Sequence, residues 1–149
     1  MATLDHRHHR HHRAPTYPAA PSWCYGTPGL ARSQQLAALA LGDTDRRRMA
    51  ERALLYCLAD PVQLGQLTDR SLCHGVGGLL RVVQRVATDA EEPGAFTARL
   101  PHLAERFLSA DSPAKAGFLE GAAGAALAFQ SAEVRAVPLG NWDACLLLT

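Results

Sequence analysis

A glycine-centred signature that occurs three times constrains this chain more than any other feature of its sequence. The copies are WCYGTPG at 23–29, LCHGVGG at 72–78 and FLEGAAG at 118–124. Aligned on the first glycine of each copy, they are separated by 49 and 46 residues. Apolar stretches of helical character lie between the copies, and this combination is typical of a helical hairpin repeated around or along an axis. The signature therefore predicts a repeat array.

The stretches between the signatures show helical periodicity and no strand-like alternation, which predicts an all-α chain. Glycine just beyond Leu41 and oxygen-bearing side chains at 43–45 are typical end and start signals of helices. The predicted helices span Leu30–Leu41, residues 43–60, Gly75–Ala90, residues 96–107 with Pro101 in a first turn or at a kink, and Ala122–Ala132.

Two of the predicted helices, and the connection at 62–71, allow predictions of which side chains are buried. Apolar residues of the second helix follow the three-and-four spacing of one buried face, and the third helix keeps its apolar residues apart from Arg81, Gln84 and Arg85. The connection 62–71 is expected to pack against the core through its apolar residues. The predicted buried positions of the second helix and of this connection are Ala50, Ala53, Leu54, Cys57, Leu58, Val62, Leu64 and Leu67.

Composition and charge exclude several classes of function. The formal net charge is +1, and the 48% hydrophobic and 19% charged residues are ordinary for a globular domain. This balance gives no reason to expect nucleic acid or a membrane surface as a partner. No apolar run approaches the roughly 20 residues of a membrane span, and the basic N-terminus lacks the apolar region of a secretory signal. We therefore expect a cytoplasmic protein.

The first 20 residues differ in composition from the rest of the chain. They contain a His/Arg tract at 6–13, followed by prolines and small residues. Such a segment has too little apolar surface to offset the entropy of ordering, so we expect a disordered tail at 1–20 and a folded domain at 21–149. His-rich tracts can bind metal, but this one has no fixed geometry, and a solvated tail is the favoured interpretation.

The four cysteines fall into two kinds. A reducing cytosol favours free thiols and metal ligands over disulfides. Cys57 lies on the apolar stripe of the second helix and Cys145 lies in the apolar C-terminal sequence. We predict that both are small buried hydrophobic residues.

The other two cysteines occupy the same position of successive signatures. Cys24 and Cys73 are equivalent, His74 follows directly, and the third copy has Leu119 and Glu120 at these two positions. If equivalent loops gather at one end of the array, Cys24, Cys73 and His74 converge. Two thiols and an imidazole indicate a zinc ion with one coordination position open.

In combination and order, these motifs resemble the C-terminal half of the lanthionine synthetase C-like family. The resemblance runs from about residue 21 to the end of the chain. The motifs that carry it are SWCYGTPG at 22–29, LCHG at 72–75, LEGAAG at 119–124 and WDACLL at 142–147.

The resemblance implies an α/α toroid of helical hairpins, of which this chain forms a part, with zinc bound by Cys24, Cys73 and His74. Cyclases of the family add a cysteine thiol of a precursor peptide to a dehydrated Ser or Thr, which forms the thioether ring of a lantibiotic. The implied partners are therefore a dehydrated precursor peptide, and a dehydratase or a complementary N-terminal half. Tyr25 matches a family tyrosine beside the first zinc cysteine and is implied to assist at the site.

The chain departs from the family pattern in its N-terminal part. The upstream half of the family, with a histidine and an aspartate in acid-base or supporting roles, has no counterpart before residue 21. The His/Arg tract does not match the motif around that histidine, so no catalytic role is carried onto it. An arginine that often precedes the first motif is also missing, since Arg13 is the last arginine before Cys24.

Two alternatives to a cyclase remain open at the level of sequence. A structural or interaction protein would use the same three zinc ligands with a fourth from Glu120 or a tail histidine. An inactive fragment is the other, because three signatures give about five helices and a closed toroid needs more than twice that number. Leu36, Leu39 and Leu41 would then face water, and we expect an aggregated, oligomeric or partly ordered chain without independent cyclase activity.

Overall fold

The computed structural model describes residues 20–133 and 141–149, and within these ranges the chain is helical and contains no strand. The all-α prediction is therefore confirmed. Of the predicted tail at 1–20, only Ala20 lies within the described residues. The elements are α1 (Thr27–Leu41), α2 (Thr44–Ala59), α3 (Pro61–Gly65), α4 (Val76–Asp89), α5 (Pro93–Thr97), α6 (Leu100–Ser109), α7 (Ala122–Glu133) and the 3₁₀ helix η1 (Trp142–Leu146).

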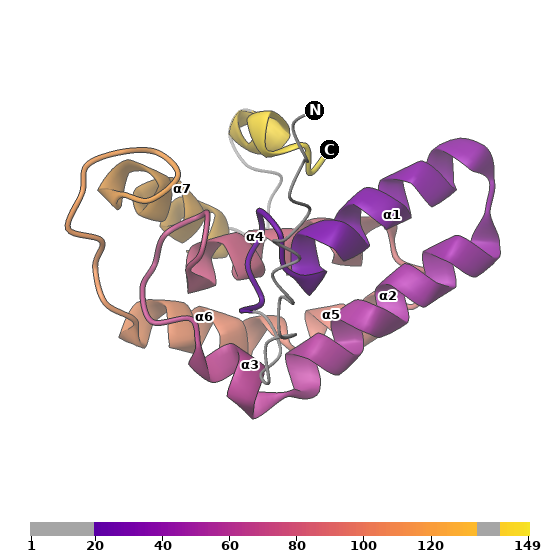
Figure 1. The fold of residues 1–149 in the computed structure, drawn as a ribbon, viewed down its shortest axis with the longest axis horizontal. Helices are drawn as coiled ribbons and strands as arrows, with labels where there is room; N and C mark the ends of the chain where they lie inside the picture. The colour runs from indigo at the N-terminus through magenta and orange to yellow at the C-terminus, as the bar shows by residue number, and fades with distance from the viewer. Residues whose placement is uncertain (1–19, 134–140) are drawn as a thin grey trace, which may run out of the picture.

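The helices that follow the three signatures, α1, α4 and α7, pack in sequence order. Helix α4 contacts α1 on one side and α7 on the other, and α1 and α2 form an antiparallel hairpin at one end (Figure 1). Helices α5 and α6 cover a further face of α4. This arrangement of helical hairpins is consistent with part of an all-α toroid.

Helix α4 is central because most of its residues are buried, although Gln84, Arg85, Thr88 and Asp89 form a more exposed polar face. Ten of its residues are buried, including Arg81, whose side chain was expected to lie away from the apolar face. The hydrophobic core around α4 also takes Leu54 and Leu58 from α2, Phe96 from α5, and Leu103 and Phe107 from α6. The core is therefore continuous across the first two repeats.

Helix boundaries agree with the sequence signals except in the connections. Gly42 ends α1 in the left-handed conformation with φ 68°, which suits a residue without Cβ, and Asp43 caps α2 through a bond from the Arg46 amide. Pro101 lies in the first turn of α6, so the fourth predicted helix is two helices, α5 and α6. The short helix α3 lies within the segment predicted as a connection, where Leu64 and Leu67 are buried and Val62 is exposed.

One glycine in each signature allows a close backbone contact. A Cβ at Gly29, Gly78 or Gly124 would overlap the carbonyl oxygen six residues earlier, which belongs to Trp23, Leu72 or Phe118 respectively. Real Cβ atoms do not approach this closely, so only glycine lets each helix start against its own loop. The same contact in three copies explains why the signature recurs.

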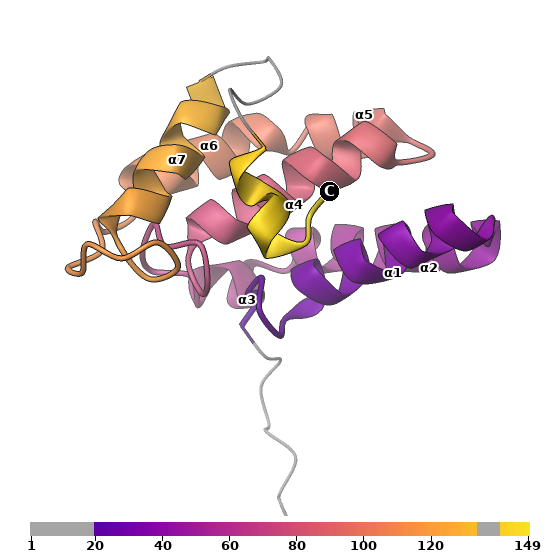
Figure 2. The same ribbon diagram turned by 90° about the horizontal axis from the view of Figure 1, so that it is seen from above.

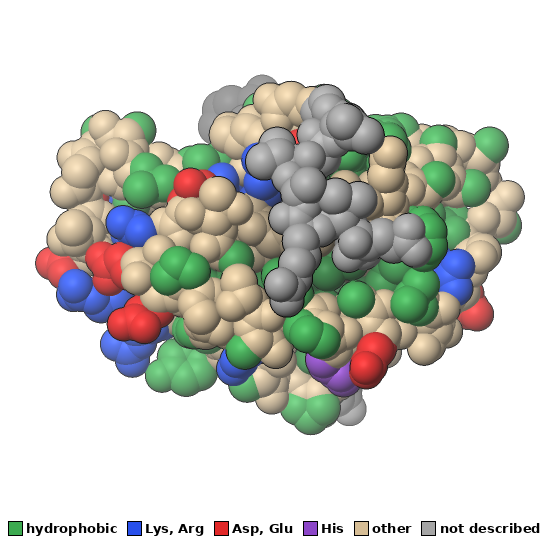
Figure 3. Space-filling view, turned by 180° about the vertical axis from the view of Figure 1, so that it is seen from behind, with side chains coloured by type: hydrophobic (Ala, Val, Ile, Leu, Met, Phe, Trp, Pro, Cys, Tyr) green, Lys and Arg blue, Asp and Glu red, His purple; other side chains and the backbone are tan. Residues whose placement is uncertain are grey.

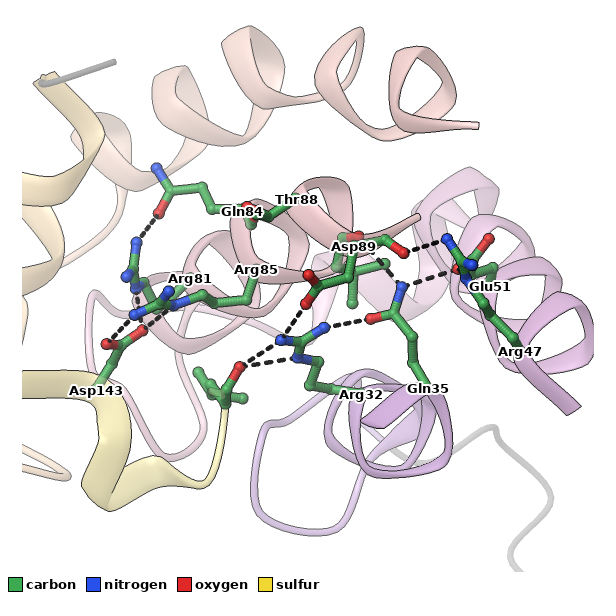
Figure 4. Close-up of polar contacts among 12 residues, drawn as sticks. Arg32, Gln35, Arg47, Glu51, Arg81, Gln84, Arg85, Thr88, Asp89 and Asp143 are labelled. Carbon is green, nitrogen blue, oxygen red and sulfur yellow. Dashed lines mark hydrogen bonds and ion pairs between the residues drawn. The ribbon is translucent and has the colours of Figure 1, made fainter. Parts of the chain in front are cut away.

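Buried polar side chains join the C-terminal segment to α1 and α4 (Figure 4). The fully buried carboxylate of Asp143 accepts from Arg81 Nε at 2.7 Å and from Arg85 Nε at 2.6 Å. Burial alone would raise the pKa of Asp143, but the hydrogen bonds and charges of the two arginines outweigh burial and lower it to about 2. Asp143 is therefore ionised at neutral pH.

A second part of this network links α1, α2 and α4. Arg32 pairs with Asp89 at 2.7 Å, and Gln35 donates to Glu51 at 2.9 Å and to the Val86 carbonyl at 3.2 Å. Arg32, Gln35 and Glu51 are buried, whereas the Asp89 side chain is 34% exposed (Figure 4). Because a buried polar group costs stability unless it is paired, the network fixes how the three helices meet.

Large apolar side chains of α1 remain at the surface. Leu39 is 41% exposed and Leu41 is 72% exposed, as predicted, whereas Leu36 is half-buried. From behind, charged side chains gather mainly on one side of the molecule and hydrophobic ones spread across the rest (Figure 3). No helix within the described ranges combines the length and apolar character needed to cross a membrane.

The two cysteines outside the signatures differ in their environments. Cys57 is buried at 3% exposure, as predicted, and burial with the nearby Asp60 charge raises the pKa of its thiol to about 11. Cys145 is exposed, so the prediction that it is buried is wrong. It lies on η1, where a turn of only five residues buries Asp143 and Leu146 instead. Ala53 of α2 is likewise exposed, against prediction.

Alanine at Gly78 is expected to destabilise the fold, because its Cβ would collide with the backbone at Leu72. Overpacking against backbone costs about 2 kcal/mol or more. Gly94→Ala is the matched control, since a Cβ there meets no atom within 4 Å and the residue lies in α5. Urea denaturation that gives equal stability for the two variants would show that the close contact is unimportant.

The cysteines are expected to react with a maleimide in an order set by burial. Cys24 and Cys145 are exposed and should be labelled in the native protein, whereas Cys57 should be labelled only on unfolding, since its thiol is buried and its pKa is about 11. Peptide mass spectrometry after a short labelling pulse measures the order. Protection of Cys145 in the native protein would contradict the placement of η1.

Candidate metal centre

The structure brings together the three residues that the sequence predicts as ligands. Cys24 lies in the loop before α1, and Cys73 and His74 lie in the loop before α4. Because α1 and α4 pack against each other, the equivalent loops meet at one end of the pair. The two thiol sulfurs and one imidazole nitrogen all lie within 4.8 Å of one another. Residues 49 positions apart in sequence thus form one cluster.

The spacing of these atoms suits a tetrahedral metal ion. Cys24 Sγ lies 3.4 Å from His74 Nδ1 and 3.6 Å from the Cys73 carbonyl oxygen. In tetrahedral zinc, Zn–S and Zn–N bond lengths place a sulfur and a nitrogen ligand about 3.6 Å apart. Two cysteines and a histidine are also a common donor set for zinc. The residues present therefore fit a zinc ion.

The electrostatic environment of Cys73 favours a cation. Burial raises the pKa of its thiol to about 11, and the neighbouring Cys24 and the charge of Glu120 act in the same direction. A negative charge near the Cys73 thiol disfavours its thiolate form. A divalent cation reverses this effect, since it binds the thiolate form and releases the protons.

The cluster is open to solvent on one side. Cys24 and His74 are exposed and Cys73 is half-buried. The Tyr25 ring lies 5.4 Å from the His74 ring at an interplanar angle of 54°, and Tyr25 is itself 65% exposed. The cluster is therefore accessible from solvent, with the Tyr25 ring beside it.

The third signature supports the cluster through its backbone. The Leu119 carbonyl accepts from the amides of Leu72 at 3.0 Å and Cys73 at 2.8 Å. Glu120, at the position equivalent to His74, instead accepts from Lys115 at 2.7 Å. This hydrogen bond lowers the pKa of Glu120, and the charges of Lys115 and His74 act in the same direction. Among the described residues, the Glu120 carboxylate does not join the ligand group.

Sequence reasoning did not identify two features of this site. The role of the Leu119 carbonyl leaves no trace in residue type, since any residue offers the same oxygen. Trp23 precedes Cys24, packs beside Gly78, and donates from its indole Nε1 to the Leu146 carbonyl at 3.0 Å. Its aromatic side chain in the signature was a visible signal, but its partner lies 123 residues away.

Comparisons with known proteins show the family of this chain. No curated protein and no solved structure matches the chain. The model of the family described as "Lanthionine synthetase C-like protein" matches residues 4–147. This match covers nearly the whole sequence and includes all three signatures and the cluster of Cys24, Cys73 and His74. The chain belongs to the lanthionine synthetase C-like family.

Proposed function

We propose that this chain is a zinc-dependent lanthionine cyclase-like protein, which adds a cysteine thiol of a peptide to a dehydrated Ser or Thr. The observation that carries the proposal is the open cluster of Cys24, Cys73 and His74 in a chain of this family. The proposed partners are a dehydrated precursor peptide, and a dehydratase or a complementary N-terminal half. The product is a thioether ring of the lantibiotic type.

The reaction balances as a simple addition. The peptide sulfur forms a bond to Cβ of the dehydrated residue, the carbon–carbon π bond opens, the thiol loses its proton, and Cα gains one. The thiolate is the nucleophilic form of sulfur. Zinc bound at the site supplies a Lewis acid that lowers the pKa of a thiol in its open position.

Each residue of the cluster has a defined part in this proposal. Cys24 and Cys73 would hold the ion as thiolates, and their negative charges would make the ion a weaker electron acceptor, which would keep a substrate thiolate reactive. His74 supplies the neutral third ligand. Tyr25 is assigned an assisting role at the edge of the site, where its ring lies against His74.

The geometry gives less support to a structural zinc site. Structural sites have four protein ligands. Of the fourth ligands considered, Glu120 is paired with Lys115 and lies outside the ligand group, and the tail histidines lie outside the described residues. An exposed cluster of three protein ligands instead leaves a position for a substrate thiol.

The double substitution Cys24→Ala, Cys73→Ala is expected to abolish stoichiometric zinc binding, because one imidazole cannot retain the ion. Zinc per chain is measured by atomic emission after dialysis. The measurement is made in protein whose tract histidines at 6–12 are replaced by asparagine, so that the tract contributes no metal. Cys57→Ala with Cys145→Ala is the matched control and should keep one zinc per chain.

A peptide thiol is expected to enter the open position of the site. In cobalt-substituted protein, thiolate-to-cobalt absorption should rise by about half when a cysteine peptide is added, as two thiolates become three. The same peptide with S-methylcysteine should cause no change. Unchanged absorption with the thiol peptide would instead support a closed structural site.

Ring formation can be followed on a dehydrated peptide as loss of alkylatable thiol, since the addition leaves the mass unchanged. Ring formation that persists in the Cys24→Ala variant would show that the reaction does not require this cluster.

A further inference from the structure

The C-terminal segment, residues 141–149, contacts all three signature repeats. Leu146 accepts from Trp23 in the first copy, Asp143 pairs with Arg81 and Arg85 in the second, and Trp142 packs edge-on against Phe118 of the third with ring centroids 6.1 Å apart. Figure 2 shows η1 lying over α4, between α1 and α7. The segment therefore spans the array.

The loops of the three signatures are connected by different kinds of contact. The second and third loops share two backbone hydrogen bonds, both accepted by the Leu119 carbonyl. Within residues 20–133 and 141–149, no backbone hydrogen bond joins the Cys24 loop to the Cys73 loop. The loop that supplies Cys24 is thus held in a different way.

Side chains beside Cys24 replace the missing backbone bonds. Trp23 packs its Cβ against Gly78 at the start of α4, and its indole Nε1 donates to Leu146. On the helix that follows this loop, Arg32 Nε and Nη2 donate to the Leu148 carbonyl at 2.9 and 2.7 Å. The hydrogen bonds of Trp23 and Arg32 therefore both attach this part of the chain to the C-terminal segment.

Two equivalent arginines anchor this segment. Arg32 and Arg81 occupy the same repeat position, 49 residues apart like Cys24 and Cys73, and each is nearly fully buried. Both donate to the C-terminal segment, Arg32 at Leu148 and Arg81 at Asp143. The repeat geometry therefore directs the C-terminal segment to the first two repeats, those that supply the ligands.

We propose that residues 141–149 act as a clamp that positions Cys24 against Cys73 and His74, with Trp23 as the positioning residue. The inference rests on the proposed function only in assigning zinc to the cluster. Trp23 connects the clamp to the ligand, because it precedes Cys24 and is bonded to Leu146 at 3.0 Å. Partners that orient metal ligands typically change metal affinity by 10- to 100-fold when removed.

The test compares Trp23→Phe with Trp142→Phe in the full chain carrying Cys145→Ser. Phenylalanine at 23 keeps the aromatic packing and removes the bond to Leu146. At 142 it removes an indole N–H that is buried without a partner among the described residues, which makes it a matched control. The first readout is metal-free: the rate at which dibromobimane bridges Cys24 and Cys73 in the presence of a chelator. The second is cobalt affinity, followed by thiolate-to-cobalt absorption.

Asp143→Asn is a second variant, which loosens the clamp at α4 without touching the Cys24 loop. We expect bridging about tenfold slower and cobalt binding about tenfold weaker in Trp23→Phe, a slowing in the same direction in Asp143→Asn, and parental values in Trp142→Phe. Melting temperatures separate local loosening from unfolding.

Bridging and cobalt affinity in Trp23→Phe within twofold of Trp142→Phe would overturn the clamp. If the parent chain fails to bind cobalt while Trp23→Phe still slows bridging, the metal in the proposed function is wrong and the clamp stands. The two proposals therefore fail by different measurements.

Discussion

The contact between a helix-opening glycine and the carbonyl oxygen six residues earlier governs the rest of this structure. At Gly29 and Gly78 that carbonyl belongs to the residue directly before a ligand cysteine, so the glycine sets where Cys24 and Cys73 lie relative to their helices. A Cβ at either position would displace the ligand loop. Since α1 and α4 then pack side by side, two equivalent loops place their thiols at one end of the helix pair.

Apolar burial around α4 and a network of polar side chains together fix this arrangement. Apolar burial around α4 supplies the driving force but little direction, because hydrophobic contact is not directional. Ion pairs with at least one buried member supply the direction: Asp143 meets Arg81 and Arg85, and Arg32 meets Asp89. The buried members, Arg32, Arg81 and Asp143, would be costly without their partners. The network therefore disfavours arrangements of the C-terminal segment that leave these charges unpaired.

Sequence periodicity was sufficient for the helices and for the convergence of Cys24, Cys73 and His74, because both depend on local or repeated patterns. Predicted bounds of 30–41 and 75–90 compare with Thr27–Leu41 and Val76–Asp89, and the equivalence of Cys24 and Cys73 led to their meeting. The pattern failed for Cys145, since an apolar run cannot show which side of a short 3₁₀ helix faces the core. Contacts accepted by carbonyls, as at Leu119 and Leu146, carry no side-chain signal at all.

One such long-range contact did leave a signal in the repeats. Arg32 and Arg81 share a repeat position, and each precedes by three residues a glutamine that accepts its hydrogen bond. Arginine is rarely buried unless it is paired, so an arginine at the same buried position of two repeats indicates polar partners close to both helices. In this chain those partners include the C-terminal segment, which holds the loop of Cys24 through Trp23. A repeat that places thiols at one end of its helices thus also places, further along the same helices, the charges that keep those thiols in position.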